Sequence, residues 1–367
     1  MIRVGVLGGG QLARMLALAG APLGIEVGFR DAAHDACAQP VARGFVGHWD
    51  DERANRAFLD WADTFTWEFE HVPWPLVERI ETTGRLHPQA RALEIKRDRA
   101  KEKAFFDEVG IPTARWRKVD TSAEIRDVVD QFGGRCVVKS RFHGYDGKGQ
   151  AVVNDACSSE QAWQMIDGQP AIAEAFVPFA GELSSIVARS ADGRCVPFPV
   201  TANVHKHGIL VESRPMKSAR AQDAHALACR LADALDYVGV LALELFETAD
   251  GELLANEFAP RVHNSGHWTI DACETSQFEQ HLRMVCGLPH GEPSWIEPAV
   301  MLNLIGGIPE RQSVLAVPGA HLHLYGKTVR EGRKVGHVTL CAADSEALDR
   351  HLAALSPLVE QSRQLVQ

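Results

Sequence analysis

The sequence has no two cysteines at C-x-x-C spacing, although its 367 residues include eight cysteines. A zinc ribbon and a framework of disulfides are therefore disfavoured, and the pattern fits reduced thiols in a cytoplasmic protein. No apolar run reaches the roughly eighteen residues that a transmembrane helix needs, so no membrane partner is expected. The glycines at 8–10 and Arg14 interrupt the apolar N-terminal stretch, which disfavours a signal peptide.

Basic residues are also in short supply, because 38 lysines and arginines face 48 acidic residues, for a net charge of −10. This deficit excludes an overall basic surface, so no nucleic-acid partner is expected. A hydrophobic content of 46% and a charged content of 23% exclude collagen-like and wholly disordered chains. The length predicts about two to three domains.

Strand and helix patterns alternate over residues 1–95, which predicts a parallel-sheet α/β domain. A strand is expected at 2–7, a helix at 11–19 and a second strand at 25–29. Between the first two, a G-x-G-x-x-A loop places exposed backbone amides at a helix start. The loop suits a dinucleotide, another phosphate-bearing ligand, or helix–sheet packing alone.

The rest of the chain has a mixed character. Residues 96–178 predict a small α+β domain, with one helix over 93–109 and a glycine-rich flap at 143–150. Residues 179–367 predict a third domain with a helix at 222–236 and with antiparallel strands toward its C-terminus. Its strands are expected at 182–189, 238–247, 252–258, 299–305, 320–329 and 334–341. The fold class is therefore multidomain, α/β followed by α+β.

Lys139 ends an apolar strand shortly before the flap, where three glycines surround Lys148. Such a loop can close over a triphosphate while Lys139 reaches it from the strand. The order of residues differs from a Walker A loop. A glycine-rich hairpin with a solvated lysine would give the same spacing.

Two glutamates are expected to face each other across a hairpin. The Asp-Gly pair at 250–251 predicts a two-residue turn, which would pair Ala249 with Glu252 and Glu244 with Glu257. Their Cβ atoms would lie about 5 Å apart on one face. Such carboxylates repel unless a cation joins them or one takes a proton, and their hard oxygens suit Mg²⁺. A glutamate bonded to a lysine or a backbone group is the alternative.

A polar run at 256–268 follows this hairpin and contains Arg261, which can hold a carboxylate, bicarbonate or phosphate bidentately. Neutral donors and acceptors follow it: His263, Asn264 and Ser265. A second cluster, of cations, surrounds the turn at 331–332 and favours a phosphorylated small molecule: Lys327, Arg330, Arg333 and Lys334. Surface loops of this composition are the alternative in both cases. No G-x-S-x-G elbow supports a serine hydrolase.

In this order the motifs resemble the ATP-grasp superfamily and, within it, the N5-carboxyaminoimidazole ribonucleotide synthetases of purine biosynthesis. The similarity runs from Gly-Gly-Gly-Gln-Leu at 8–12 to Gly-Arg-Lys-Val-Gly-His at 332–337, and His-Asn-Ser-Gly-His-Trp-Thr at 263–269 is specific to that family. The resemblance implies an ATP-grasp fold with an N-terminal Rossmann-like domain, and a homodimer. It implies carboxylation of 5-aminoimidazole ribonucleotide by bicarbonate through carboxyphosphate, with ATP and Mg²⁺ and without biotin.

The resemblance also implies residue roles. ATP would contact Arg99, Lys139, Gly144, Tyr145, Asp146, Gly147, Lys148, Gly149, Gln150, Glu174, Ala175, Phe176, Val177, Glu182, His205, Asn256 and Glu257. Glu244 and Glu257 would hold Mg²⁺. Bicarbonate and the acceptor amine would face Arg261, His263, Asn264, Ser265, Tyr145 and Asp146. The ribonucleotide, served by the first glycine loop, would contact Gln11, Glu70, Lys327, Arg333 and Lys334.

The sequence departs from the family at three positions: Ala13, where glycine is usual, His143 and Ala180. Competing hypotheses fit the motifs less well. A Rossmann dehydrogenase leaves Glu244 and Glu257 unexplained, and a non-catalytic ATP-binding regulator should have lost Lys139 or a metal ligand. A sister ATP-grasp enzyme with another acceptor is disfavoured by the run at 263–269.

Overall fold

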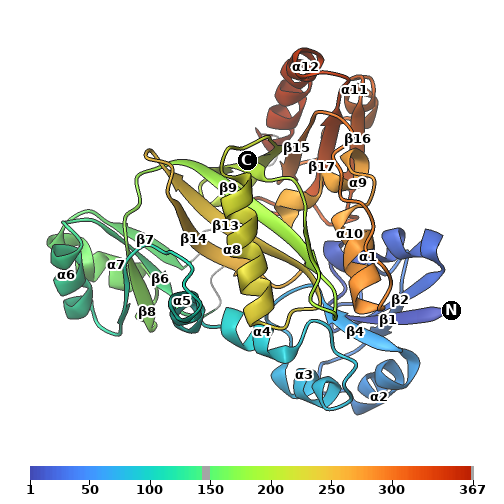
Figure 1. Ribbon diagram of the computed structural model, residues 1–367, viewed down its shortest axis with the longest axis horizontal. Coiled ribbons are helices and arrows are strands. Elements are labelled where there is room, and N and C mark those ends of the chain that lie inside the picture. The colour runs from blue at the N-terminus through green and yellow to red at the C-terminus, as the bar shows by residue number, and fades with distance from the viewer. Residues whose placement is uncertain (143–148, 365–367) are drawn as a thin grey trace.

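The computed structural model describes residues 1–142 and 149–364, whose strands form three sheets (Figure 1). The predicted flap residues Gly144, Tyr145, Asp146, Gly147 and Lys148 lie outside the described residues. The first sheet is parallel throughout, as predicted, in the order β3-β2-β1-β4. Its elements are β1 (Ile2–Leu7), α1 (Gln11–Gly20), η1 (Ala21–Leu23), β2 (Ile25–Asp31), β3 (Arg43–Val46), α2 (Glu52–Trp61), β4 (Thr64–Trp67) and α3 (Trp74–Glu81).

The expected helix over 93–109 is wrong, because the structure contains two helices there, α4 (Ala90–Lys96) and α5 (Arg99–Glu108). Asp98 separates them in an extended conformation, and its carboxylate accepts a hydrogen bond from the Ala100 amide. Such a side chain begins a new helix by satisfying a free backbone N–H. The break turns Lys96 and Arg99 toward the middle of the molecule, where both meet Glu257.

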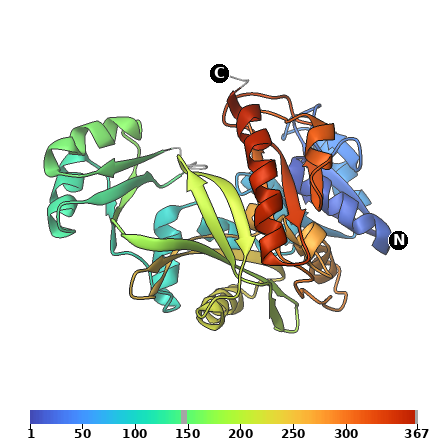
Figure 2. The same cartoon turned by 90° about the horizontal axis from the view of Figure 1, so that it is seen from above.

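The second sheet has the order β5-β8-β6-β7 and carries two helices, and it projects to one side of the molecule (Figures 1 and 2). Its elements are β5 (Trp116–Val119), α6 (Ser122–Gln131), β6 (Cys136–Ser140), β7 (Gln150–Val153), η2 (Ala156–Ser158), α7 (Ser159–Met165) and β8 (Ala171–Ala175). A separate buried cluster, which includes Val119, Val138 and Ala173, forms its core. Lys139 lies near the end of β6, and its ammonium reaches Asn256 on β14 of the large sheet.

The third sheet has nine strands and begins with β9 (Phe179–Arg189). Alternate residues of β13 (Gly239–Thr248) face opposite helices, because Leu241 and Leu243 pack with α8 and Val240 and Ala242 pack with α10. The other elements are β10 (Cys195–Pro197), β11 (Thr201–Lys206), β12 (Ile209–Pro215), α8 (Ala221–Ala234), β14 (Leu253–Ala259), η3 (Asn264–Gly266), α9 (Thr269–Ala272), α10 (Gln277–Val285), β15 (Ala299–Ile305), α11 (Arg311–Leu315), β16 (Ala320–Leu324), β17 (Lys334–Cys341) and α12 (Ser345–Gln364).

The C-terminal strands are antiparallel, as predicted, but β16 ends at Leu324 rather than at 329. The Tyr325 amide makes a last hydrogen bond to the Val335 carbonyl. The chain then leaves the sheet, because Gly326 adopts a positive φ of 76°, far from the values of a β-strand. Residues 325–333 therefore form a loop rather than a strand end. This loop reaches the start of α1, where Lys327 donates to Gln11.

The hairpin of β13 and β14 pairs Glu244 with Glu257, as predicted, but not for the predicted reason. Thr248 rather than Ala249 pairs with Glu252, so the loop is one residue longer than a two-residue turn. A β-bulge then restores the register, because Leu245 pairs with Ala255 while Glu244 pairs with Glu257. Asn256 is the extra residue of this bulge. Bulges commonly redirect a side chain beside a functional site.

Two cysteines contradict the expectation of reduced thiols. Cys195 on β10 and Cys229 on α8 form a disulfide, and the other six cysteines are free. The sequence alone could not reveal the pair, because 34 residues separate the two and only the packing of α8 against β9 and β10 brings them together. Within the described ranges, no helix is long and apolar enough to cross a membrane.

Candidate active site

A cavity of about 970 Å³ opens where the three sheets meet. Every described residue that the sequence analysis singled out for ATP, metal, bicarbonate or ribonucleotide lines this cavity, with the exception of Gly149 and Ser265. Those lining residues are Gln11, Glu70, Arg99, Lys139, Gln150, Glu174, Ala175, Phe176, Val177, Glu182, His205, Glu244, Asn256, Glu257, Arg261, His263, Asn264, Lys327, Arg333 and Lys334. Segments far apart in the chain thus converge on one space.

Glu174 on β8 holds two lysines at one end of the cavity. Its carboxylate accepts from Lys103 at 2.6 Å and from Lys139 at 2.5 Å. Burial alone would raise the pKa of Glu174, but the two ammonium groups outweigh it and lower the pKa to about 2. Lys139 also donates to the amide oxygen of Asn256, at 3.1 Å. The Glu174 side chain therefore positions Lys139, in addition to the ATP contact that the family resemblance implies for it.

Glu257 on β14 lies between two further cations. Its Oε2 atom accepts from Lys96 at 2.7 Å and from Arg99 at 3.3 Å. Burial opposes ionisation, but Lys96 and Arg99 hold the pKa of Glu257 well below its usual range. Lys96 also donates at 3.1 Å to Glu102, which is fully buried. Glu257 is thus ionised, and two cations fix its position.

Glu244 lies directly opposite Glu257, and its Oε1 atom is 3.0 Å from Nε2 of His263. Burial would raise the pKa of Glu244, but the hydrogen bond and the charge of His263 lower it. Two neighbouring ionised carboxylates supply the hard oxygen ligands that Mg²⁺ prefers, so the donor set fits that ion. Both carboxylates line the same cavity as Lys139 and Asn256.

Ser265 requires a correction, because it does not face the cavity. Its side chain is fully buried, and its hydroxyl hydrogen-bonds with Nδ1 of His263 at 2.8 Å. The turn of η3 directs the hydroxyl back onto His263, and a sequence pattern does not reveal that direction. Ser265 therefore orients the imidazole that contacts Glu244.

Two further pairs join elements across the cavity. His205 on β11 meets Glu182 on β9 at 2.9 Å, so two predicted ATP contacts pair with each other. Arg261 donates from Nε to Glu70 at 2.9 Å, which links the polar run to the N-terminal sheet. Burial would raise the pKa of Glu70, but Arg261 outweighs it and lowers the pKa.

The sequence predicted that the first glycine loop presents open backbone amides to a ligand. In the structure these amides are already occupied. The carboxylate of Glu68 accepts from the amides of Leu12 at 3.1 Å and Ala13 at 3.0 Å, and also from Gly10. An internal carboxylate thus occupies the helix N-terminus that usually attracts an anion. Gln11 points instead to Lys327, whose ammonium donates to its side-chain oxygen at 2.6 Å.

Four residues of these networks were missed by sequence reasoning: Glu68, Lys96, Glu102 and Lys103. Lys96, Glu102 and Lys103 lie in the stretch predicted to be a single charged helix, which gave them the appearance of a solvated face. The Asp-Arg pair at 98–99 was the available signal, since Asp is a strong N-cap residue and indicates a helix boundary. Glu68 left no local signal, because its partners lie about 55 residues earlier.

Matches to protein families agree with this architecture. The ribonucleotide synthetase preATP-grasp domain matches residues 1–97, and the ATP-grasp domain matches residues 104–278. The phosphoribosylaminoimidazole carboxylase C-terminal domain matches residues 299–351. The fold and the cavity therefore define an ATP-grasp ligase with a parallel-sheet preATP-grasp domain.

Individual relatives narrow the class. N5-carboxyaminoimidazole ribonucleotide synthase of Pseudomonas aeruginosa is 43% identical over 98% of this chain and 100% of its own length. A crystal structure of N5-carboxyaminoimidazole ribonucleotide synthetase from Thermus thermophilus superposes with a TM-score of 0.91, at 45% identity, over 97% of this chain and 98% of that chain. The Aspergillus clavatus enzyme, in complex with ADP and 5-aminoimidazole ribonucleotide, superposes with a TM-score of 0.91 at 31% identity, over 98% and 99%. This chain belongs to the N5-carboxyaminoimidazole ribonucleotide synthase family.

Proposed function

We propose that this chain carboxylates 5-aminoimidazole ribonucleotide with bicarbonate and ATP, releasing N5-carboxyaminoimidazole ribonucleotide, ADP and phosphate in purine biosynthesis. One observation carries the proposal, namely that a single cavity joins Lys139 and Glu257 to the cationic loop that contains Lys327. A triphosphate and a monophosphate could therefore both bind in the same cavity. The Aspergillus clavatus relative binds ADP and 5-aminoimidazole ribonucleotide together.

ATP is proposed to lie between the small sheet and the large sheet. Lys139 and Arg99 would neutralise its phosphates, and Ala175, Phe176 and Val177 would line the adenine. Phosphoryl transfer depends on charge neutralisation and alignment more than on covalent chemistry. Glu174 and Asn256 support this role because both hold the Lys139 ammonium in place. Gly149, Gln150 and the flap residues before them would close over the triphosphate.

Glu244 and Glu257 are proposed to hold Mg²⁺, which would supply positive charge to offset the negative charge of the phosphates. Neighbouring side chains favour the ionised form of both carboxylates. His263 does so for Glu244, and Lys96 and Arg99 do so for Glu257. Chain residues therefore prepare the site electrostatically before any ligand arrives.

The chemistry is proposed to proceed in two steps. A bicarbonate oxygen attacks the γ-phosphorus, and the bond to the ADP oxygen breaks, which gives carboxyphosphate. The ribonucleotide amine then attacks the carboxyl carbon, phosphate leaves, and the nitrogen loses a proton. Arg261, fixed by Glu70, would orient the bicarbonate with His263 and Asn264, and Tyr145 and Asp146 would flank the amine. No biotin is involved.

The ribonucleotide phosphate is proposed to bind at Lys327, Arg333 and Lys334, with Gln11 and Glu70 contributing from the N-terminal domain.

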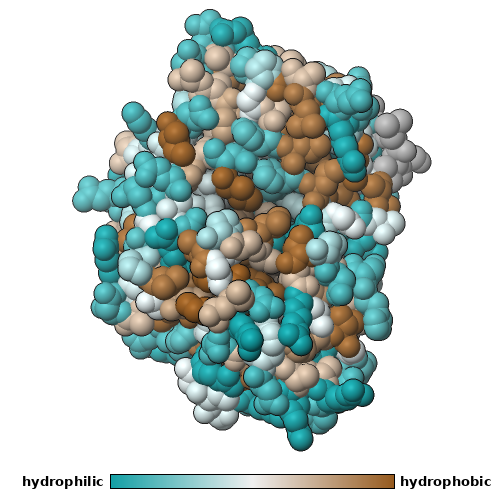
Figure 3. Space-filling model, turned by 90° about the vertical axis from the view of Figure 1, so that its right-hand side faces the viewer, coloured by the Kyte–Doolittle hydropathy of each residue, from teal (hydrophilic) through white to brown (hydrophobic). Residues whose placement is uncertain are grey.

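We also propose a cytoplasmic location, and domains at 1–95, 96–178 and 179–367. A homodimer is also proposed. On the face that Figure 3 shows, apolar patches lie among hydrophilic side chains. Leu18 on α1 is 52% exposed.

ADP release tests the proposed function. The purified protein is supplied with ATP, Mg²⁺ and bicarbonate, with and without 5-aminoimidazole ribonucleotide, and the carboxylated product is detected by mass. We expect ADP release to rise strongly with the ribonucleotide and to depend on bicarbonate. An ADP release rate that is the same with and without the ribonucleotide would overturn the assignment of 5-aminoimidazole ribonucleotide as the acceptor. No turnover by folded protein would overturn the ligase activity.

A further inference from the structure

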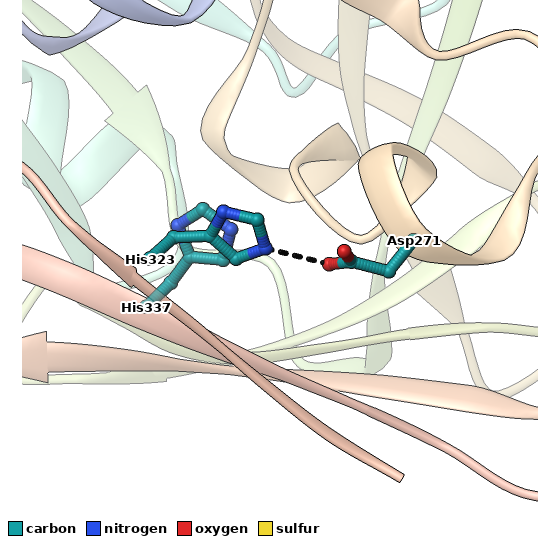
Figure 4. Close-up of side chains that lie close together, drawn as sticks. All are labelled: Asp271, His323 and His337. Carbon is teal, nitrogen blue, oxygen red and sulfur yellow. Dashed lines mark hydrogen bonds and ion pairs between the residues drawn. The ribbon is translucent and has the colours of Figure 1, made fainter. Parts of the chain in front are cut away.

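A group of metal-ligating side chains lies outside the cavity, between α9 and the C-terminal hairpin (Figure 4). Asp271 comes from α9, and His323 and His337 lie directly opposite each other on β16 and β17. Ligand atoms of the three residues all lie within 4.8 Å of one another. Among the described residues, this is the one such group of three or more.

The contacts within the group leave polar atoms without partners. His323 Nε2 lies 2.8 Å from an Asp271 oxygen, and the two imidazoles stack with ring centroids 4.4 Å apart. His337 is fully buried, and its Nδ1 atom hydrogen-bonds with the Tyr325 hydroxyl at 2.7 Å. Its Nε2 atom has no hydrogen-bond partner. On the same face of β17, the buried Thr339 hydroxyl also lacks one.

A hydrogen-bonded cluster would explain Asp271 and His323 but not the unpartnered nitrogen. A buried polar atom without a partner costs about 1–3 kcal/mol, so native structures seldom contain one without a reason. If Nδ1–H donates to Tyr325, then Nε2 carries a lone pair inside the group. Metal-bound histidines commonly donate their other ring N–H in this manner, which fixes the tautomer.

We propose that Asp271, His323 and His337 bind one divalent transition metal ion of the zinc type. Two imidazoles and one carboxylate form a ligand set that Zn²⁺ accepts readily, with bonds of about 2.0–2.2 Å. Tetrahedral geometry at such lengths places ligand atoms roughly 3.3 Å apart. Small side-chain rotations would therefore close the group around an ion, and water would complete its coordination.

The position gives the ion a structural role. α9 begins at the last residue of the run at 263–269 that carries His263, and β16 and β17 flank the loop that carries Lys327 and Arg333. An ion bound between these elements would hold the run at 263–269 and the loop between β16 and β17 in a fixed relative position. Both segments contribute to the proposed substrate site. It would be distinct from the proposed Mg²⁺ at Glu244 and Glu257, because it uses nitrogen ligands and lies on other elements.

Zinc titration of the full chain tests this proposal. Chelator-treated protein without a histidine tag is titrated with ZnCl₂ by calorimetry, in excess Mg²⁺ to occupy the carboxylate pair. We expect one tight site in the wild type, and a loss of affinity of about tenfold or more in Asp271→Asn and His323→Gln. His34→Gln, an exposed histidine, is the matched control and should bind as the wild type does.

X-ray absorption at the zinc edge of the loaded wild type supplies a readout that needs no variant. We expect two imidazole ligands and short bonds to oxygen. Zinc should also raise the unfolding temperature of the wild type and leave that of His323→Gln unchanged, because an ion that binds only the native state stabilises it. Absence of a tight site, fewer than two imidazoles, or wild-type affinity in both variants would overturn the proposal.

Discussion

Two partly buried lysines at opposite ends of one cavity show how differently its ends are built. Lys96 loses solvation, but Glu102 and Glu257 outweigh that loss and raise its pKa. Lys327 also loses solvation, and there burial together with Arg333 and Lys334 lowers the pKa. Its hydrogen bond goes to the neutral side chain of Gln11. The pKa of a lysine is therefore raised at one end of the cavity and lowered at the other.

The difference indicates two strategies for binding phosphate. At the Lys96 end, carboxylates already balance the cations, so charge is fixed in position before ATP and metal arrive. At the Lys327 end, neighbouring cations repel one another, and a phosphate would relieve that repulsion on binding. We therefore expect mutations at the first end to affect folding and chemistry, and mutations at the second to affect ribonucleotide binding.

The largest effect is expected for Lys96→Met. Removal of this ammonium leaves Glu102 buried without its cation, and breaking a buried pair costs about 3–5 kcal/mol. The free energy of unfolding, measured with urea, should fall by that amount. Lys101→Met, which removes an exposed ion pair with Glu94, should change it by less than about 1 kcal/mol. Equal effects of both substitutions would contradict the view of a charge-balanced end.

A somewhat smaller effect is expected for Glu257→Gln. The amide keeps the shape of the carboxylate but removes a proposed Mg²⁺ ligand, so kcat for ADP release should fall about 10²–10³-fold. Glu252→Gln, an exposed residue in the turn of the same hairpin, is the control and should retain wild-type kcat. Wild-type turnover by Glu257→Gln would exclude Glu257 as a metal ligand.

Lys327→Gln should act on binding alone. Loss of a charged contact to phosphate costs about 1.5–3 kcal/mol, so the KM for the ribonucleotide should rise about 10- to 150-fold. kcat and the KM for ATP should remain nearly unchanged, and the exposed Arg311→Gln is the control. A fall in kcat with an unchanged KM for the ribonucleotide would contradict the contrast between the two ends.

The lowered pKa of Lys327 adds a pH dependence. The ammonium deprotonates below the ordinary lysine value of 10.5, and the neutral amine binds phosphate weakly. The KM for the ribonucleotide in the wild type should therefore begin to rise at a pH below 10.5. In Lys327→Gln this rise should be absent, which steady-state kinetics over alkaline pH can test.

The sequence predicted the elements that local patterns determine. Parallel strands in the first domain and the pairing of Glu244 with Glu257 are confirmed, although the latter required a longer loop and a bulge at Asn256 that offset each other. Neither feature leaves a period-2 signal, so the correct pairing followed from two compensating errors. The end of β16 at Leu324 was missed for a similar reason, because Gly326 and one backbone bond decide it.

Contacts between distant segments were beyond local reasoning. Glu68 caps a helix about 55 residues earlier, and Lys96 meets Glu257 161 residues later, so only the assembled fold brings the partners together. The order of motifs nevertheless indicated which residues share the cavity. Residue types and their spacing predicted the ligands better than they predicted the residues that hold those ligands in position.

The smallest effect is expected at the His205–Glu182 pair, which belongs to the charge-balanced end. Burial alone would lower the pKa of His205, but Glu182 outweighs it and raises the pKa above 6.5. A raised histidine pKa stabilises the fold fully below the unfolded value, and this stabilisation is lost as pH rises through the folded value. His205→Gln should therefore reduce the free energy of unfolding by about 1 kcal/mol or less at pH of about 6, and by nearly nothing at pH of about 9. Glu182→Gln should remove the same pH dependence, and a difference that grew with pH would show that the pair does not balance charge.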